Sequence, residues 1–216
     1  MTAYTKRLQK VTAVLCTTAL LAGCAAGTSD STEPAATTAQ VKAITIEPTA
    51  AYQTMNGFGA SACWWSQEVG NWENAKDILS LLYDENSGIG LNIYRYNLGA
   101  GSKDDATITD LDRRAEAFID KDGSYHWERD AAAQNALALA RSMNEDLRVT
   151  LFSNSAPVFY TANGKAYCDY LPDEENYVTN LEPERYADFA KYSIACAKHF
   201  TEAGYRVTGL SPINEP

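Results

Sequence analysis

The sequence predicts an α/β fold in which parallel strands belong to a (β/α)8 TIM barrel, with the first four strands lying within the 216 residues. The main observation is the order strand, helix, strand, helix, strand, helix, strand, because this repetition produces a parallel sheet with crossover helices. An open doubly wound sheet competes, but no GxGxxG or GxxxxGK[ST] motif follows a strand to favour its nucleotide-binding forms. Polar and aromatic side chains follow the strands instead, where barrel enzymes carry their chemistry.

The first residues of the chain are typical of an export signal rather than of a folded domain. The basic residues Lys6, Arg7 and Lys10 precede an apolar stretch at 11–22, which is too short to span a membrane and leads into Leu-Ala-Gly-Cys24. This pattern predicts a bacterial lipoprotein signal peptide, with the thiol of Cys24 as the lipid site. An ordinary cleaved signal with a chance cysteine is the alternative. We therefore expect an exported protein that is lipid-anchored to the bacterial membrane or cell surface.

Cleavage of the signal peptide at 1–23 would make the protein more acidic. It would remove three basic residues and no acidic one, which changes the formal net charge from −10 to −13. No run of Lys and Arg offsets this charge, so we expect no nucleic-acid partner. Residues 24–40 are small and polar and predict a flexible tether, so the folded domain is expected at 41–216.

The cysteines and histidines do not predict a metal site or a cofactor. Cys63, Cys168 and Cys196 have no CxxC spacing, and His126 and His199 stand apart in the sequence. One disulfide with a free thiol, or three buried thiols, remain open. The oligomeric state is not predicted by the sequence.

The predicted elements follow from hydrophobic periodicity and from Gly, Pro and Asn at their ends. The first segment, 41–48, alternates apolar and polar residues as a strand that either begins the barrel or joins a side β-domain. Asn74 is a plausible N-cap of the first helix, and Asp122-Gly123 suggests a small hairpin. The remaining strands are expected at 55–62, 91–101, 147–153 and 206–216, and the helices at 75–83, 129–143 and 183–203.

The last predicted strand carries the strongest catalytic candidate. Glu215 follows Asn214 in the segment GLSPINEP. A carboxylate at a strand end inside an aromatic cleft is partly desolvated, which raises its pKa and lets it hold a proton for donation. The neighbouring amide both donates and accepts hydrogen bonds, as needed to hold a sugar hydroxyl beside the bond that breaks.

Four further residues at strand ends are candidates for binding a substrate. Arg95 lies in an otherwise buried strand and must be paired, either in a structural ion pair or at a site, and Asn97 faces the same side. Trp64 and Trp65 follow a glycine-rich strand and offer flat faces on which a sugar ring can lie. Because successive side chains alternate, we expect at least one of these two rings at the site.

At this point the residues resemble glycoside hydrolase family 30, within the clan of barrel glycosidases whose acid/base glutamate follows an asparagine on the fourth strand. The likeness is greatest to the branch that contains endo-β-1,6-galactanases. The matching segments occur in order over 53–216 and are QTMNGFGASACWW (53–65), GIGLNIYRYNLGAG (88–101), LFSNSAPVFYTANG (151–164) and GLSPINEP (209–216).

The resemblance implies a retaining glycosidase with a glycan substrate, in which Glu215 is the general acid/base and Asn214 binds the 2-hydroxyl of the sugar. It implies that Arg95, Asn97 and Asn154 support the sugar next to the cleaved bond and that Trp64 or Trp65 forms a wall of the cleft. Phe159 stands where several relatives have a tryptophan.

The nucleophile implied by the resemblance is expected on a later strand, outside these 216 residues. Residues 41–216 then hold four of the eight strands of a barrel, which is about half of its repeats. An open sheet edge and uncovered apolar faces would make this part alone poorly soluble and inactive. The alternatives are a surface lipoprotein that binds glycans without cleaving them, and a glucosylceramidase-type or xylanase-type member of the same family.

Overall fold

The computed structural model describes residues 45, 47–168 and 180–214. The chain divides into two compact units, Met1–Tyr52 and Gln53–Pro216. The predicted signal peptide, Cys24 and the tether lie outside the described residues. The strand predicted at 41–48 is not confirmed: Thr45 and Glu47 are in no strand, and Glu47 instead opens a turn in which its carboxylate accepts hydrogen bonds from Thr49.

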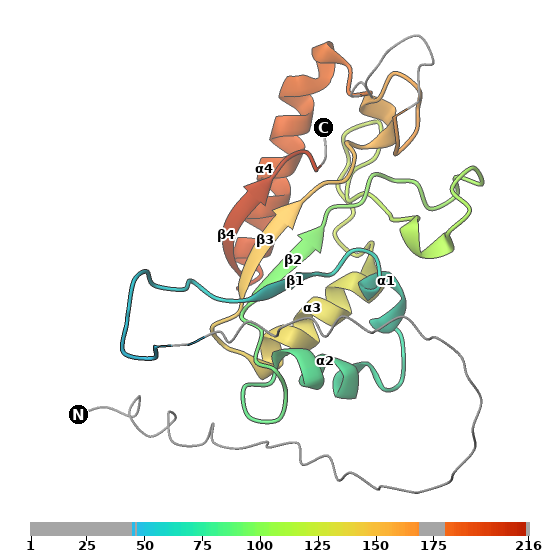
Figure 1. Ribbon diagram of the computed structural model, residues 1–216. Helices are drawn as coiled ribbons and strands as arrows, with labels where there is room; N and C mark the ends of the chain where they lie inside the picture. Colours follow the sequence, from blue (N-terminus) through green and yellow to red (C-terminus); the bar gives the residue numbers. More distant parts are fainter. Residues whose placement is uncertain (1–44, 46, 169–179, 215–216) are drawn as a thin grey trace, which may run out of the picture. The chain divides into compact units, whose positions relative to one another are not determined.

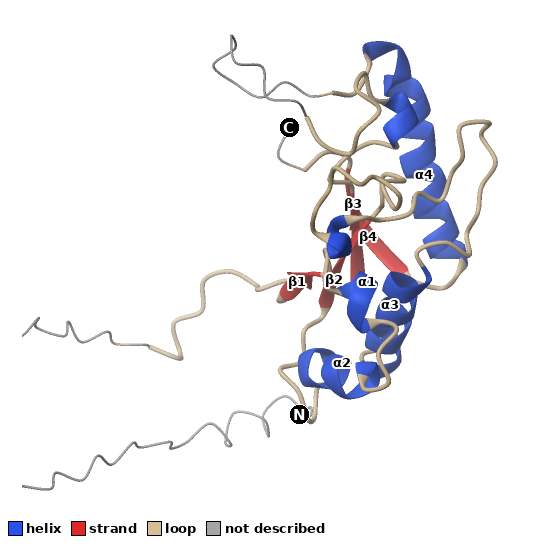
Figure 2. Ribbon diagram, turned by 90° about the vertical axis from the view of Figure 1, so that its right-hand side faces the viewer, coloured by secondary structure: helices blue, strands red, loops and turns tan. Residues whose placement is uncertain are grey.

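The second unit contains a four-stranded sheet in which all pairings are parallel and the strand order is β1-β2-β3-β4 (Figure 1). All four helices lie on one side of this sheet (Figure 2). The predicted α/β class and the predicted order of strands and helices are therefore confirmed. The elements are β1 (Gly59–Ser61), α1 (Ser66–Val69), α2 (Ala75–Tyr83), β2 (Ile93–Asn97), α3 (Ala131–Met143), β3 (Arg148–Phe152), α4 (Tyr186–Glu202) and β4 (Arg206–Ser211), with 3-10 turns η2 (Leu111–Arg113), η3 (Val158–Tyr160) and η4 (Pro183–Arg185).

Strand β2 shows how alternation divides the sheet into two chemically different faces. Tyr94 and Tyr96 point to the helices and are completely buried in the hydrophobic core. Arg95 and Asn97 point to the opposite face. They pair in register with Thr150 and Phe152 of β3, which brings the polar side chains of β2 beside the end of the next strand. One face of the sheet thus stabilises the fold, and the other is available for a site.

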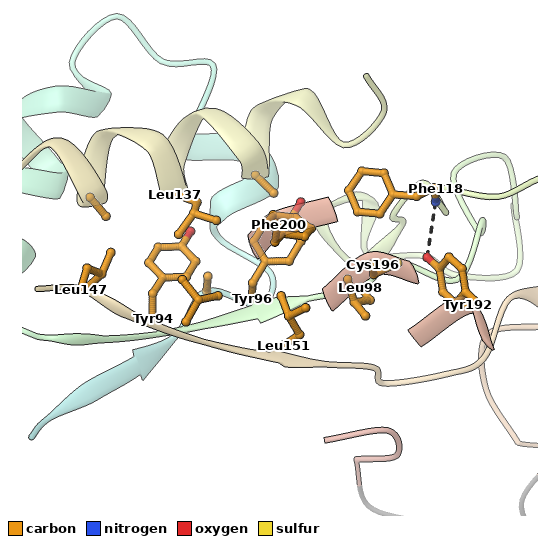
Figure 3. Close-up of a cluster of buried hydrophobic side chains, with 14 of the residues drawn as sticks. Tyr94, Tyr96, Leu98, Phe118, Leu137, Leu147, Leu151, Tyr192, Cys196 and Phe200 are labelled. Carbon is orange, nitrogen blue, oxygen red and sulfur yellow. Dashed lines mark hydrogen bonds between the residues drawn. The ribbon is translucent and has the colours of Figure 1, made fainter. Parts of the chain in front are cut away.

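The core between the sheet and the helices is built from aromatic and aliphatic side chains (Figure 3). Leu137 of α3 and Leu151 of β3 are completely buried, and Phe200 of α4 packs against Tyr96 with 4.9 Å between ring centroids. Small alanines on the inner face of α3 let this helix lie close to the sheet. The buried side chains drawn and named in the figure are Tyr94, Tyr96, Leu98, Phe118, Leu137, Leu147, Leu151, Tyr192, Cys196 and Phe200.

Gly59 and Gly70 are two of the glycines that close approach requires. A Cβ atom on Gly59 would lie 2.6 Å from the Cβ of Ile93 on the paired strand, and one on Gly70 would lie 1.7 Å from the carbonyl oxygen of Ala132. Gly70 therefore permits the contact between α1 and α3, and a larger residue would push these helices apart.

Several local expectations are corrected by the structure. Strand β1 spans three residues instead of the eight predicted at 55–62, and the short helix α1 was not predicted. Asn74 precedes α2 but makes no side-chain capping hydrogen bond. The hairpin near Gly123 is present as a single antiparallel bridge between Ile119 and Tyr125. Within the described part of the chain, no helix is long and apolar enough to cross a membrane.

Strand β4 is the edge of the described sheet and has an apolar surface beside it. Leu210 and Ile213 are 39% and 41% exposed, and a groove of about 420 Å³ is lined by them and by Tyr186 and Ile194 of α4. This exposed edge and groove are the features expected of an unclosed part of a barrel.

Candidate active site

A chain of side-chain hydrogen bonds crosses the C-terminal ends of the strands. Arg95 Nη2 donates to Asn214 Oδ1 at 2.7 Å, and Asn214 Nδ2 donates to Asn154 Oδ1 at 3.1 Å. Asn154 Nδ2 in turn donates to Asn97 Oδ1 at 3.4 Å. Parallel strands end at the same edge of a sheet, and this places residues from β2, from the segment after β3 and from the segment after β4 within reach of one another.

Arg95 is held in position by its neighbours on both strands. Its guanidinium lies 3.4 Å from the centroid of the Phe152 ring, and Nη1 donates to Ser61 Oγ at 3.4 Å. Among the described residues it makes no ion pair, so its partners there are amide, hydroxyl and aromatic groups. A guanidinium stacked on a ring keeps its N–H edge free for directional donation, and here that edge points to Asn214.

Asn214 is also fixed through its backbone, because its N–H donates to the carbonyl of Ser153 at 3.0 Å. This bond ties the segment after β4 to the end of β3. Glu215, the predicted acid/base, directly follows and lies outside the described residues. The amide next to the predicted catalytic position is therefore immobilised from three directions: by Arg95, by Asn154 and by its own backbone.

Cys63 belongs to this network although the sequence did not suggest it. Its Sγ accepts a hydrogen bond from Asn154 Nδ2 at 3.0 Å. Burial raises the pKa of this thiol to about 11, more than the hydrogen bond from Asn154 and the nearby Arg95 lower it. Cys63 is thus a neutral thiol at physiological pH, which fits a structural acceptor and not a nucleophile.

The two adjacent tryptophans have different environments. The ring of Trp64 lines a cavity of about 460 Å³ together with Asn97 and Asn154, and the guanidinium of Arg113 lies 4.6 Å from its centroid. Trp65 instead packs against the core, and its Nε1 donates to the Ser61 carbonyl at 2.9 Å. The expectation that at least one ring borders the site holds for Trp64, and Trp65 has a structural position.

Phe159 does not join the other candidates. It lies in η3, packs against the core and contacts Tyr160 with 4.6 Å between ring centroids. It also lines a separate charged cavity that contains Lys103 and Glu116. The structure therefore brings together Arg95, Asn97, Asn154, Asn214 and Trp64, and it places Trp65 and Phe159 elsewhere.

Of the two alternatives for the cysteines, a disulfide with a free thiol or three thiols, the structure has three thiols. Cys63, Cys168 and Cys196 are all free thiols; Cys196 is fully buried and the other two are partly buried. No group of three His, Cys, Asp or Glu side chains in the described residues is arranged to hold a metal ion. The polar groups that meet at the strand ends are amides and a guanidinium, which suit the hydroxyl groups of an uncharged ligand.

Comparisons with known proteins identify the family of the chain. Residues 41–216 match the family model described as O-Glycosyl hydrolase family 30. The chain is 28% identical over 199 residues to an endo-beta-1,6-galactanase of Hypocrea rufa, covering 80% of this chain and 39% of that protein. It is 27% identical over 235 residues to an exo-beta-1,6-galactobiohydrolase of Bifidobacterium longum subsp. longum, covering 80% of this chain and 15% of that protein.

A solved structure shows the same likeness. The crystal structure of a conserved exported protein from Bacteroides fragilis superposes with a TM-score of 0.66 at 29% identity, covering 76% of this chain and 35% of that one. The chain thus spans well under half of the length of these proteins. The four consecutive parallel strands fit a partial barrel of the kind predicted, and the family model covers most of the sequence. The chain belongs to O-glycosyl hydrolase family 30.

Proposed function

We propose that the full-length protein is a retaining glycoside hydrolase that acts on β-1,6-linked galactose chains, with Glu215 as its general acid/base. The observation that carries this proposal is the anchoring of Asn214, the residue before Glu215, by Arg95 and Asn154. An amide fixed in this way binds a sugar hydroxyl in one orientation, beside the place where the acid/base would stand.

The galactose specificity is supported by the two curated relatives, which are both named for β-1,6-galactose linkages. In the proposed mechanism Glu215 protonates the leaving oxygen while a second carboxylate, about 5–5.5 Å away, attacks the anomeric carbon. Glu215 then removes a proton from the water that releases the sugar. No described Asp or Glu is hydrogen-bonded to Arg95 or Asn214, and we propose that the nucleophile comes from a later strand of the barrel.

Substitution of the acid/base tests this function in the full-length protein. Glu215→Gln should reduce hydrolysis of β-1,6-galactan by roughly 10²–10⁴-fold, because general acid–base catalysis contributes about this much, and glycan affinity should persist. The exposed Glu184→Gln is the matched control and should keep native activity. Unchanged hydrolysis in Glu215→Gln would refute the assignment. Glycan binding without any hydrolysis by the native protein would favour a non-catalytic binding lipoprotein. A panel that adds xylan and glucosylceramide separates the family branches.

We also propose that the protein is exported and anchored through lipid on Cys24. The basic residues before the apolar stretch and the LAGC sequence support this, and a similar solved protein is described as exported. Cys24→Ser should release the protein from the membrane fraction and abolish labelling with a radioactive fatty acid. Cys16→Ser, which changes a cysteine inside the signal peptide, should leave both unchanged. Continued labelling of Cys24→Ser would contradict the anchor.

A further inference from the structure

The segment at the end of β1 meets the hydrogen-bond network of the candidate site at two points. Ser61, the last residue of β1, accepts a hydrogen bond from Arg95 Nη1 through its Oγ at 3.4 Å. Cys63, two residues later, accepts one from Asn154 Nδ2 through its Sγ at 3.0 Å. Among the described residues neither side chain is hydrogen-bonded to Asn214, so both act on the residues that hold it.

Together these contacts close a ring of hydrogen bonds. The side chain of Asn214 is held by Arg95 at 2.7 Å and by Asn154 at 3.1 Å. Ser61 holds the first of these two partners, and Cys63 holds the second. Because Ser61 and Cys63 are separated by a single residue of the chain, the backbone completes the ring. A closed ring restrains each member from two sides, so the orientation of Asn214 depends on residues to which it is not bonded.

The base of this ring is fixed to the sheet. Ser61 pairs in register with Arg95, and the N–H of the buried Ala62 donates to the Arg95 carbonyl at 2.9 Å. In addition, Trp65 Nε1 donates to the Ser61 carbonyl at 2.9 Å. The backbone around Ala62 therefore has little freedom to shift, and the acceptor groups of Ser61 and Cys63 stay where the sheet places them.

The donor and acceptor roles around the ring are determined by the guanidinium. It can only donate, so Asn214 accepts through Oδ1 and donates through Nδ2. Asn154 must then accept through Oδ1, which directs its Nδ2 to Cys63. The other acceptor of this Nδ2 group, Asn97 Oδ1, is farther away at 3.4 Å. Loss of the thiol would therefore loosen Asn154, which is one of the two side chains that hold Asn214.

We propose that Ser61 and Cys63 are positioning residues of the reaction, which close a hydrogen-bonded ring and so set the orientation of the Asn214 amide without contacting the substrate. The inference rests on the proposed function, in which Asn214 binds a hydroxyl of the sugar. An amide turned out of this orientation loses its bond to the 2-hydroxyl, whereas the other contacts of the sugar remain. The ring therefore contributes to recognition of this hydroxyl and not to sugar binding in general.

The test compares two substrates in full-length Cys63→Ala. Both are aryl β-galactoside oligomers, one intact and one lacking the 2-hydroxyl of the sugar next to the cleaved bond. For the intact substrate kcat/KM should fall roughly three- to tenfold, as expected for one neutral hydrogen bond, and for the deoxy substrate it should stay within about twofold of the native value.

Two further cysteine variants separate positioning from packing. Cys63→Ser restores an acceptor and should recover most of the loss on the intact substrate. Cys196→Ala removes a completely buried thiol of the core. It should leave the ratio of kcat/KM for the two substrates at the native value, because a loss of packing does not distinguish a sugar by its 2-hydroxyl.

Ser61→Ala keeps the test decisive if Cys63→Ala does not fold, and it should cause the same selective loss for the intact substrate. The affinities of both variants for the two glycans are also measured by calorimetry in the Glu215→Gln background, which needs no hydrolysis. Equal losses for the two glycans, no loss for either, or no binding at all would overturn the positioning role. A selective loss of affinity, in a protein whose native form does not hydrolyse the glycan, would uphold that role and refute the proposed catalytic function.

Discussion

Arg95 in the second strand donates a 2.7 Å hydrogen bond to the side-chain oxygen of Asn214, which follows the fourth strand. The bond connects β2 to the segment that follows β4. Because Arg95 also lies flat on Phe152, 3.4 Å from the ring centroid, the guanidinium has one preferred orientation. The position of Asn214 therefore depends on an aromatic ring of β3, the strand that pairs with β4.

The role of Arg95 in orienting Asn214 is tested by Arg95→Lys in the full-length protein. An ammonium keeps the charge but cannot stack flat and donate in the plane of the ring. Loss of one hydrogen bond from a charged group costs about 1.5–3 kcal/mol, so kcat/KM for β-1,6-galactan should fall roughly 10–100-fold. Arg148 begins β3, at the end of the strand away from Phe152, so Arg148→Lys should keep near-native activity. Equal activity of both variants would show that Arg95 does not position the site.

The buried carboxyl of Asp130 predicts a distinct pH dependence of stability. Burial raises its pKa to about 7, although the Tyr96 hydroxyl donates to it at 2.6 Å. The folded state keeps the proton that the unfolded state has released, so this group's contribution to stability is present at low pH and is lost as the pH rises from about 4 to 7. Asp130→Asn stays neutral, and its stability relative to the native protein should rise across this range by about 4 kcal/mol.

Denaturant unfolding of the full-length protein at several pH values measures this difference. Asp122→Asn is the control of opposite sign. The side-chain hydroxyl and backbone N–H of Ser124 lower the pKa of Asp122. Asp122→Asn should therefore lower the free energy of unfolding at neutral pH and change it little at acid pH. A pH-independent difference between Asp130→Asn and the native protein would contradict a raised pKa at Asp130.

The core on the helix side of the sheet could be predicted because core-facing and site-facing residues alternate along the strands. Tyr94 and Tyr96 alternate with Arg95 and Asn97, and this alternation alone separates the core face from the site face. The same regularity predicts that residues at the ends of parallel strands meet, which is why Asn154 and the other amides form one network.

Other features depend on contacts that no local pattern encodes. The indole N–H of Trp65 donates to the Ser61 carbonyl, which holds this ring away from the site. Phe159 lies in a 3-10 turn and packs against the core. The stacking of Arg113 on Trp64 depends on how a long loop closes. The sequence gives no reason to place Cys63 at the site, and its contact with Asn154 is visible only in three dimensions.

The core between α3 and the sheet should be sensitive to truncation. Leu137 is completely buried, so Leu137→Ala leaves a cavity and should lower the free energy of unfolding by about 2–5 kcal/mol. Leu81 on α2 is 63% exposed, and Leu81→Ala should change it by about 0.5 kcal/mol or less. Chemical denaturation of the full-length variants gives both values. Similar losses for the two leucines would contradict the packing described for α3.

The thiol of Cys63 should resist alkylation. With a pKa of about 11, only roughly 0.1% of it is thiolate at pH 8, and the thiolate is the reactive form. Cys196, whose pKa burial raises to about 12, should be slower still. Mass spectrometry of the native protein after iodoacetamide treatment measures both rates against free cysteine. Alkylation of Cys63 as fast as free cysteine would show that it is not a neutral acceptor for Asn154.

The central claim, that Glu215 next to the anchored Asn214 is the acid/base of a retaining glycosidase, is tested most directly by chemical rescue. In full-length Glu215→Ala, an aryl β-galactoside oligomer with a good leaving group should still form the glycosyl-enzyme, which then accumulates because no base activates water. Azide needs no base, so it should restore turnover and release a β-glycosyl azide of retained configuration. Restored turnover with the β-azide as product is the predicted result. Unimpaired hydrolysis without azide, or an α-azide, would contradict the account.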